Sequence, residues 1–216
     1  MPITESDLLY KYTGTAGTTN PETALGGSLG PNTIPSGVDN NVFDDVTGSE
    51  SSLGEQHYRA IGIHNTLDTH TWMNTSIRVD GYDRAGSNYD VIYFGVEKPV
   101  TGAGDPDGTI QIIGSETTAP AAIGWTAEGA PSAYIAISGT DYTGSIGADD
   151  WAGIWLQRSI PAGADAYSNR SCTIRVQGET SASPLVHQVS AVFKVDWTDT
   201  IFNVTKVAEE IKARTE

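Results

Sequence analysis

Apolar and polar residues alternate along most of the chain. In the run "TWMNTSIRVDG" (71–81), every second residue from Met73 to Val79 is apolar or β-branched, which is typical of a strand with one buried face. Similar short runs, bounded by Gly, Pro, Asp or Asn, occur at 57–65, 89–97, 108–114, 121–126, 133–138, 153–159, 172–179 and 185–197. About nine such runs with no helical spacing between them predict a mainly β protein, an antiparallel, jelly-roll-like β-sandwich over residues 57–200.

The segment 151–180, "WAGIWLQRSIPAGADAYSNRSCTIRVQGET", contains two of these runs. The Pro161-Ala162-Gly163 sequence between them favours a turn. We therefore predict a β-hairpin that forms part of the scaffold.

Residues 1–56 follow a different pattern. A first strand is predicted over 7–13, "DLLYKYT", but the apolar residues of 14–56 are spaced too irregularly for a strand or a helix. This stretch is either a surface loop pinned to its own core or an extended N-terminal arm that packs against neighbouring subunits. The arm hypothesis predicts interface contacts by six apolar residues: Leu25, Leu29, Ile34, Val42, Phe43 and Val46.

The last segment, 201–216, predicts a short C-terminal helix. Val204, Val207 and Ile211 have the spacing of one helix face, and Asn203 is a suitable N-cap. A helix of about twelve residues is marginal alone, so we expect these three residues to dock on the sandwich or on a neighbouring subunit.

Charge and composition narrow the function classes. The 216 residues carry a net charge of −15, which disfavours binding to nucleic acids or to anionic membranes. A single cysteine, Cys172, excludes an intrachain disulfide, and its strand context predicts a buried side chain. We see no basic, apolar leader at the N-terminus and no run long enough to span a membrane.

Two groups of residues resemble metal sites. On one unbroken strand, His64, Asp68 and His70 would share a face, although a turn is favoured there and would leave exposed histidines at loop ends. The "DPDG" at 105–108 resembles the start of a calcium loop with Glu116 as its late ligand, but Asp, Pro and Gly also favour a plain turn between strands. We prefer the turn in both cases and expect no metal.

Catalytic residues are not indicated either. The acid pairs Asp44/Asp45 and Asp149/Asp150 are adjacent in sequence, so their side chains would point apart on an extended chain instead of facing each other. The sequence lacks the Gly-x-Ser-x-Gly, Walker and His-Glu-x-x-His motifs. We expect neither an enzyme nor a bound cofactor.

Tryptophan offers one alternative, a glycan-binding platform. The five residues of this type are Trp72, Trp125, Trp151, Trp155 and Trp197. Most lie inside strand patterns, and Trp151 and Trp155 would share one sheet face with Gly153 between them. Core packing is therefore the preferred role.

Three segments resemble a group of small structural proteins encoded by tailed bacteriophages and related viruses. They are "NPETALGGSLG" (20–30), "NVFDDVTGSESSLGEQHYRAIGIHNT" (41–66) and "GIWLQRSIPAGADAYSNRSCTIRVQGET" (153–180). This chain has Ala24 where serine is usual in the group, and it has Ile160 before the Pro-Ala-Gly turn where valine is usual.

The resemblance implies a virion component, made in the host cytoplasm, whose partners are other virion proteins. We expect a head decoration or cement protein that contacts the major capsid protein and forms a homo-oligomer, with a trimer favoured. A neck, tail or baseplate component and a glycan-binding, receptor-binding spike are the alternatives.

Overall fold

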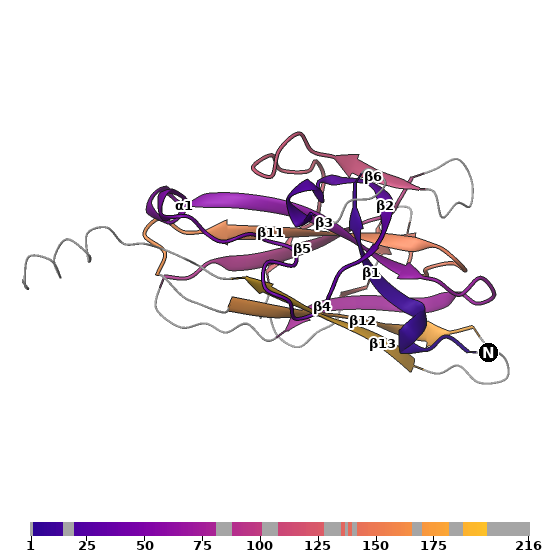
Figure 1. Ribbon diagram of the computed structural model, residues 1–216. Helices are drawn as coiled ribbons and strands as arrows, with labels where there is room; N and C mark the ends of the chain where they lie inside the picture. Colours follow the sequence, from indigo (N-terminus) through magenta and orange to yellow (C-terminus); the bar gives the residue numbers. More distant parts are fainter. Residues whose placement is uncertain are drawn as a thin grey trace, which may run out of the picture.

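The computed structural model is a β-sandwich, as the alternation predicts (Figure 1). It describes residues 2–14, 20–80, 88–100, 108–127, 135–136, 138–139, 142–165, 170–181 and 188–197. Every strand pairing among these residues is antiparallel. The predicted fold class is confirmed.

The larger sheet has seven strands. Their spatial order is β6 (Thr109–Ile112), β2 (Gly26–Thr33), β1 (Leu8–Thr13), β3 (Glu55–Asn65), β11 (Trp151–Ile160), β5 (Val91–Glu97) and β7 (Thr126–Ala127). The sheet curls, because Val100, just after β5, bridges to Thr109 of β6. Gln111 of β6 also donates from its backbone N–H to Glu97 Oε1 (3.0 Å). The outer edge of β6 is thereby partly covered.

The second sheet has four strands. Their order is β13 (Gln188–Trp197), β12 (Arg170–Thr180), β4 (Trp72–Asp80) and β8 (Ile135–Ala136). A separate ribbon is formed by β9 (Ser138–Gly139) and β10 (Tyr142–Thr143). Among the described residues, the helical elements are the 3₁₀ turns η1 (Glu5–Asp7) and η2 (Pro21–Thr23) and the six-residue α1 (Gly48–Leu53). Across the described ranges, no helix has the length and apolarity needed to cross a membrane.

The alternation of β3 and β11 builds two cores. Ile61 and Ile63 of β3, with Ile154 and Leu156 of β11, face the second sheet and pack in the main core. The intervening residues face outward, where Trp151 and Trp155 of β11 join a second cluster with Tyr58, Ala60, Ile110 and Ile113. Both faces of the central strands are therefore buried.

Glycine makes room for this second cluster. Gly62 of β3 and Gly153 of β11 are cross-strand neighbours. A Cβ atom on Gly62 would lie 2.3 Å from Leu29 Cδ1, and one on Gly153 would lie 2.8 Å from Ile110 Cγ2. The outer layer can approach the sheet only because these positions lack side chains.

The N-terminal segment is not an arm held away from the sandwich. Within residues 1–56, β1 and β2 are inner strands of the larger sheet: β1 pairs with β3, and β2 pairs with β1. Four of the residues predicted at an interface are instead buried in the protein's own core: Ile34, Val42, Phe43 and Val46. Leu25 and Leu29 are half-buried against the second cluster. Register shifts in the pairing of β2 with both neighbours disrupt the period-two pattern, which explains why the sequence looked irregular.

The prediction of a hairpin over 151–180 is also wrong. Both strands exist, but β11 pairs with β3 and β5 in the larger sheet, whereas β12 pairs with β4 and β13 in the smaller one. The Pro-Ala-Gly turn therefore begins a crossing between the layers. The predicted helix, with Val204, Val207 and Ile211, lies outside the described residues. Cys172 is buried, as expected.

Candidate functional site

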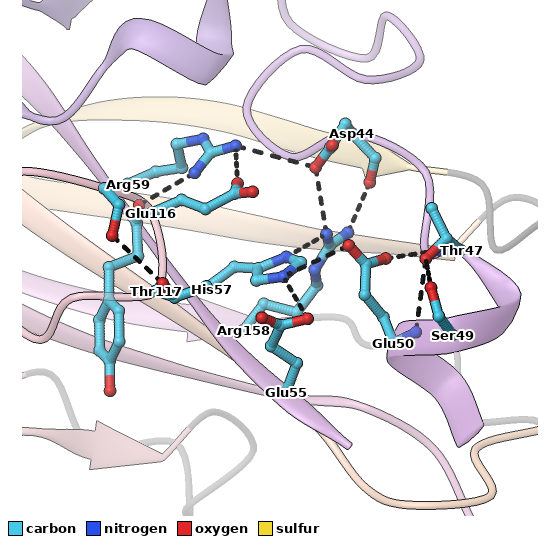
Figure 2. A network of polar contacts seen from close by, with 12 residues as sticks. Asp44, Thr47, Ser49, Glu50, Glu55, His57, Arg59, Glu116, Thr117 and Arg158 are labelled. Carbon is cyan, nitrogen blue, oxygen red and sulfur yellow. Dashed lines mark hydrogen bonds and ion pairs between the residues drawn. The ribbon is translucent and has the colours of Figure 1, made fainter. Parts of the chain in front are cut away.

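Ionisable side chains meet at the end of the sandwich where α1 lies (Figures 1 and 2). We call this group the polar network; it comprises Asp44, Glu50, Glu55, His57, Arg59, Glu116 and Arg158. Its basic members lie at core-facing positions, because His57 and Arg59 continue the series of Ile61 and Ile63 on β3. Arg158 of β11 is the cross-strand partner of His57. The acidic members reach these positions from α1, from the first residue of β3 and from two loops.

Arg158 connects β11 to the loop before α1. Its Nη1 donates to the backbone oxygen of Asp44 (2.6 Å), and its Nη2 donates to Asp44 Oδ1 (3.3 Å) and to His57 Nδ1 (2.8 Å). The guanidinium also lies 4.8 Å from the centre of the Phe43 ring, within cation–π range. The side chain of Arg158 is fully buried, so these contacts replace the hydration of its two terminal nitrogens.

Arg59 connects β3 to the turn that follows β6. Its Nη2 donates to Glu116 Oε2, and its Nη1 donates to the backbone oxygen of Tyr58 (3.2 Å). The backbone N–H of Tyr58 donates to the backbone oxygen of Glu116 (2.7 Å). Burial alone would raise the pKa of Glu116, but the charge and hydrogen bond of Arg59 outweigh it and lower that pKa below 4.5.

His57 lies between a cation and two carboxylates. A guanidinium only donates, so the contact from Arg158 requires an unprotonated Nδ1, and the neutral ring carries its proton on Nε2. Nε2 is buried without a hydrogen-bond partner and lies 3.7 Å from both Glu50 Oε1 and Glu55 Oε2. Burial and the Arg158 charge lower the pKa of His57, although nearby acids raise it in part.

The geometry of the polar network does not fit a metal ion. Among the described residues, two sets have ligand atoms within 4.8 Å of one another, and both include His57: Asp44, His57 and Glu116, and Glu50, Glu55 and His57. In the first set, Arg158 and Arg59 already bind the donor atoms. In the second, the tautomer places a proton on the nitrogen that would have to bind the metal. A ligating histidine normally donates its other N–H to an acceptor, which Arg158 is not.

A second contact between a histidine and a carboxylate lies at the opposite end of β3. His64 Nε2 lies 3.1 Å from Asp149 Oδ1, and His64 Nδ1 is buried without a partner. Burial and the charge of Lys11 lower the pKa of His64 more than Asp149 raises it.

The residues that resemble metal sites have other partners where the structure describes them. His64 faces Asp149 and not Asp68, since residues 68 and 69 form the expected turn. Glu116 binds Arg59, while Asp105 and Asp107 lie outside the described residues. The expectation of exposed histidines is wrong for His64, which is buried on β3.

The acid pairs do point apart. Asp44 binds Arg158, whereas Asp45 accepts a hydrogen bond from Asn40 (2.9 Å). Asp149 contacts His64, whereas Asp150 accepts from the backbone N–H of Trp151 (2.7 Å).

Tryptophan packing also agrees with the prediction. Trp72, Trp151 and Trp155 are buried, and Trp155 donates from Nε1 to Glu97 Oε2 (2.6 Å). Trp125 is half-buried, with its ring centroid 5.7 Å from that of Tyr58. The side chain of Trp197 lies outside the described residues.

The sequence contained one overlooked signal for the polar network. In "HYRAIGIHN" (57–65), His57 and Arg59 share the phase of Ile61 and Ile63, which indicates charged groups on a core-facing stripe. Buried charges require partners, so acids from elsewhere in the chain had to lie opposite them. Which acids these were depends on loop geometry.

No family model matches the chain, and no curated protein matches it. Among solved structures, a family 123 glycoside hydrolase from Clostridium perfringens is 12% identical with a TM-score of 0.34, over 73% of this chain and 22% of that protein's length. AvmM, which catalyses a macrocyclisation in alchivemycin A biosynthesis, is 8% identical with a TM-score of 0.36, over 88% of both chains. CfaE, the adhesive subunit of the CFA/I fimbria of enterotoxigenic Escherichia coli, is 12% identical with a TM-score of 0.30, over 66% of this chain and 41% of that one. Similarity at this level does not indicate a shared function.

Proposed function

We propose that this protein is a non-enzymatic structural protein of a tailed-bacteriophage virion and that it acts as a decoration or cement protein on the head. The proposal depends on the resemblance of segments 20–30, 41–66 and 153–180 to such proteins, and on how these segments meet in the fold.

The observation that supports the proposal most directly is that the three segments bind one another. Segments 41–66 and 153–180 contain β3 and all but the first two residues of β11, and these strands pair along their length. Ala60 donates from its backbone N–H to the backbone oxygen of Ala24 (2.8 Å), and Gly163 donates to the backbone oxygen of Ser51 (2.6 Å). The residues that resemble the phage proteins therefore hold strands and turns together, and Asp44, His57 and Arg158 among them contact one another.

A protein of this kind acts through contact area. Each Å² of apolar surface removed from water contributes roughly 25 cal/mol, and symmetry repeats that gain over many copies on a shell. The described residues include four large, exposed apolar side chains that are available for such contacts: Val38, Leu53, Val100 and Ile112. We expect a homo-oligomer, with a trimer favoured, bound to the major capsid protein.

Electron microscopy of particles made from the genome that encodes this chain tests the proposal. Antibody label spread over the head, with loss of heat resistance of the heads when the gene is deleted, is the expected result. Label confined to the neck, tail or baseplate would favour that alternative, and absence from purified particles would overturn the virion proposal. Light scattering of the purified protein measures the oligomer, and specific binding on a glycan array would favour the spike.

A further inference from the structure

The two ring nitrogens of His57 face groups of opposite charge. Nδ1 accepts from Arg158 of β11, and the proton on Nε2 faces Glu50 of α1 and Glu55 of β3. The other charged groups near the ring are Asp44 and Glu116, from two loops, and Arg59 of β3. The side chain of His57 is only 1% exposed, so bulk water does not substitute for any of these partners.

We propose that protonation of His57 exchanges its partners: the imidazolium loses Arg158 and pairs with Glu50 and Glu55, while Arg158 remains bound to Asp44. The polar network is then a pH-sensitive switch that ties β3 to β11 when His57 is neutral and ties β3 to α1 when His57 is charged. This inference does not depend on the proposed virion function.

The exchange follows from the donor and acceptor capacity of the groups. The added proton can bind only at Nδ1, where it meets the N–H of Arg158 at a site that held a hydrogen bond of 2.8 Å. Two donors and two positive charges then face each other in a buried site, and they separate. Arg158 retains the backbone oxygen and Oδ1 of Asp44.

The carboxylates are placed to receive the charged ring. Nε2 is 3.7 Å from each of them, beyond hydrogen-bond range, so a small rotation makes at least one charge-assisted contact. Glu50 is itself fixed, because its Oε2 accepts from the backbone N–H of Thr47 (2.6 Å) in the capping box of α1. The new contact therefore connects the imidazolium to α1.

Opposing effects act on the protonation of His57. Burial and Arg158 oppose protonation, and Glu116, Glu50 and Asp44 favour it. The folded protein consequently holds the neutral ring near pH 7 and accepts the proton below the ordinary histidine pKa of 6.5.

Nuclear magnetic resonance of the full chain with ¹⁵N-labelled histidine tests the switch. At neutral pH we expect His57 to have its proton on Nε2, and we expect a titration midpoint below 6.5. The Glu50→Gln variant keeps an acceptor for the cap but removes a charge, so the midpoint should move down by a few tenths of a pH unit. Glu22→Gln, at an exposed position in η2, should leave the midpoint unchanged.

Arg158→Lys provides the second variant, and Arg158→Met the third where it folds. Removing the guanidinium contact from Nδ1 should raise the midpoint of His57, by more for Met than for Lys. A neutral ring with its proton on Nδ1 would overturn the proposal. A His57 midpoint that is the same in the wild type and in the Glu50 and Arg158 variants would also overturn it. In uniformly ¹⁵N-labelled protein, a backbone amide signal of Glu50 that changes with the His57 midpoint in the wild type but not in His57→Gln would support it.

Discussion

Three glycines lie on the outer face of the larger sheet, on neighbouring strands. Gly62 and Gly153 are paired, and Gly95 of β5 pairs with Trp155 on the same face. A Cβ atom on Gly95 would lie 2.3 Å from Ile123 Cγ2, as close as the contact at Gly62. At the scale of single residues, the second cluster thus depends on the absence of side chains.

Gly62→Ala tests this directly. The added methyl would meet Leu29 and lie 2.8 Å from the ring of Trp151. Because this overpacks the outer face of the sheet, the unfolding free energy of the variant should be lower by about 1–3 kcal/mol. Urea denaturation measures the loss. Gly124→Ala is the matched control, because a Cβ there has no atom within 4 Å. Equal stabilities of the two variants would contradict the close-packing argument.

Arg158 should be the most sensitive single residue of the polar network. Arg158→Met leaves Asp44 and His57 without their donor in a buried site, and we expect a loss of about 3–5 kcal/mol by urea denaturation. Glu22→Ala, at an exposed position, should change stability by less than about 0.5 kcal/mol. In a double-mutant cycle, Asp44→Asn should show a coupling with Arg158→Met of about 0.5–3 kcal/mol. Additive effects would mean that the two residues do not stabilise each other.

At the scale of elements, the alternation of apolar and polar residues predicts strands well where most residues keep the period of two, and poorly where glycines and bulges remove it. The run 71–81 is β4, and Thr75, Ile77 and Val79 are buried as the alternation predicts. A register shift in its pairing with β12 buries Trp72 in place of Met73. The strand β2, "GGSLGPNT", is rich in glycine and bulged, so its apolar residues lose the period of two. The pairing partners of β11 and β12 depend on long-range packing, which a turn sequence such as Pro-Ala-Gly does not encode.

The site was predictable only in part for the same reason. The phase of His57 and Arg59 on β3 is readable from the sequence, whereas the approach of Asp44 and Glu116 depends on two irregular loops. A pattern of spacings locates side chains along one element. It does not place two loops against each other.

The edge of β6 offers a prediction at this scale. Glu97 accepts from the backbone N–H of Gln111 and from Trp155 Nε1, so it covers the edge and satisfies a buried indole. Glu97→Ala should lose about 1–3 kcal/mol of unfolding free energy, because the indole N–H is left without an acceptor. Chemical denaturation compares it with Glu22→Ala, an exposed control. A loss no larger than that of the control would show that the contact contributes little.

At the scale of the whole molecule, stability should depend on pH in a defined direction. Burial lowers the pKa values of His57 and His64 below 6.5, so the unfolded chain binds protons first as the pH falls through 6.5. Unfolding free energy should therefore be highest above pH 6.5 and decrease below it. A further loss should follow below pH 4.5, because Arg59 holds the pKa of Glu116 under that value.

Denaturant titrations from pH 7.5 to 4 measure this profile. The double variant His57→Gln/His64→Gln should have a flatter profile just below pH 6.5 and keep the loss below pH 4.5. A wild-type profile that rises as the pH falls through 6.5 would contradict the assignment of two buried, neutral histidines.

The integration of residues 1–56 into the sandwich leads to the last prediction. An arm held away from the core could be removed without unfolding the remainder, but β1 pairs with β3, and Val42 and Phe43 are fully buried. Removing this segment would leave β3 with an open edge and uncover both cores. We therefore expect the fragment 57–216 to lack a cooperative unfolding transition, and adding the separate peptide 1–56 should restore one in calorimetry. A fragment 57–216 that folds cooperatively alone would show that the two inner strands are dispensable, and the arm hypothesis would regain its basis.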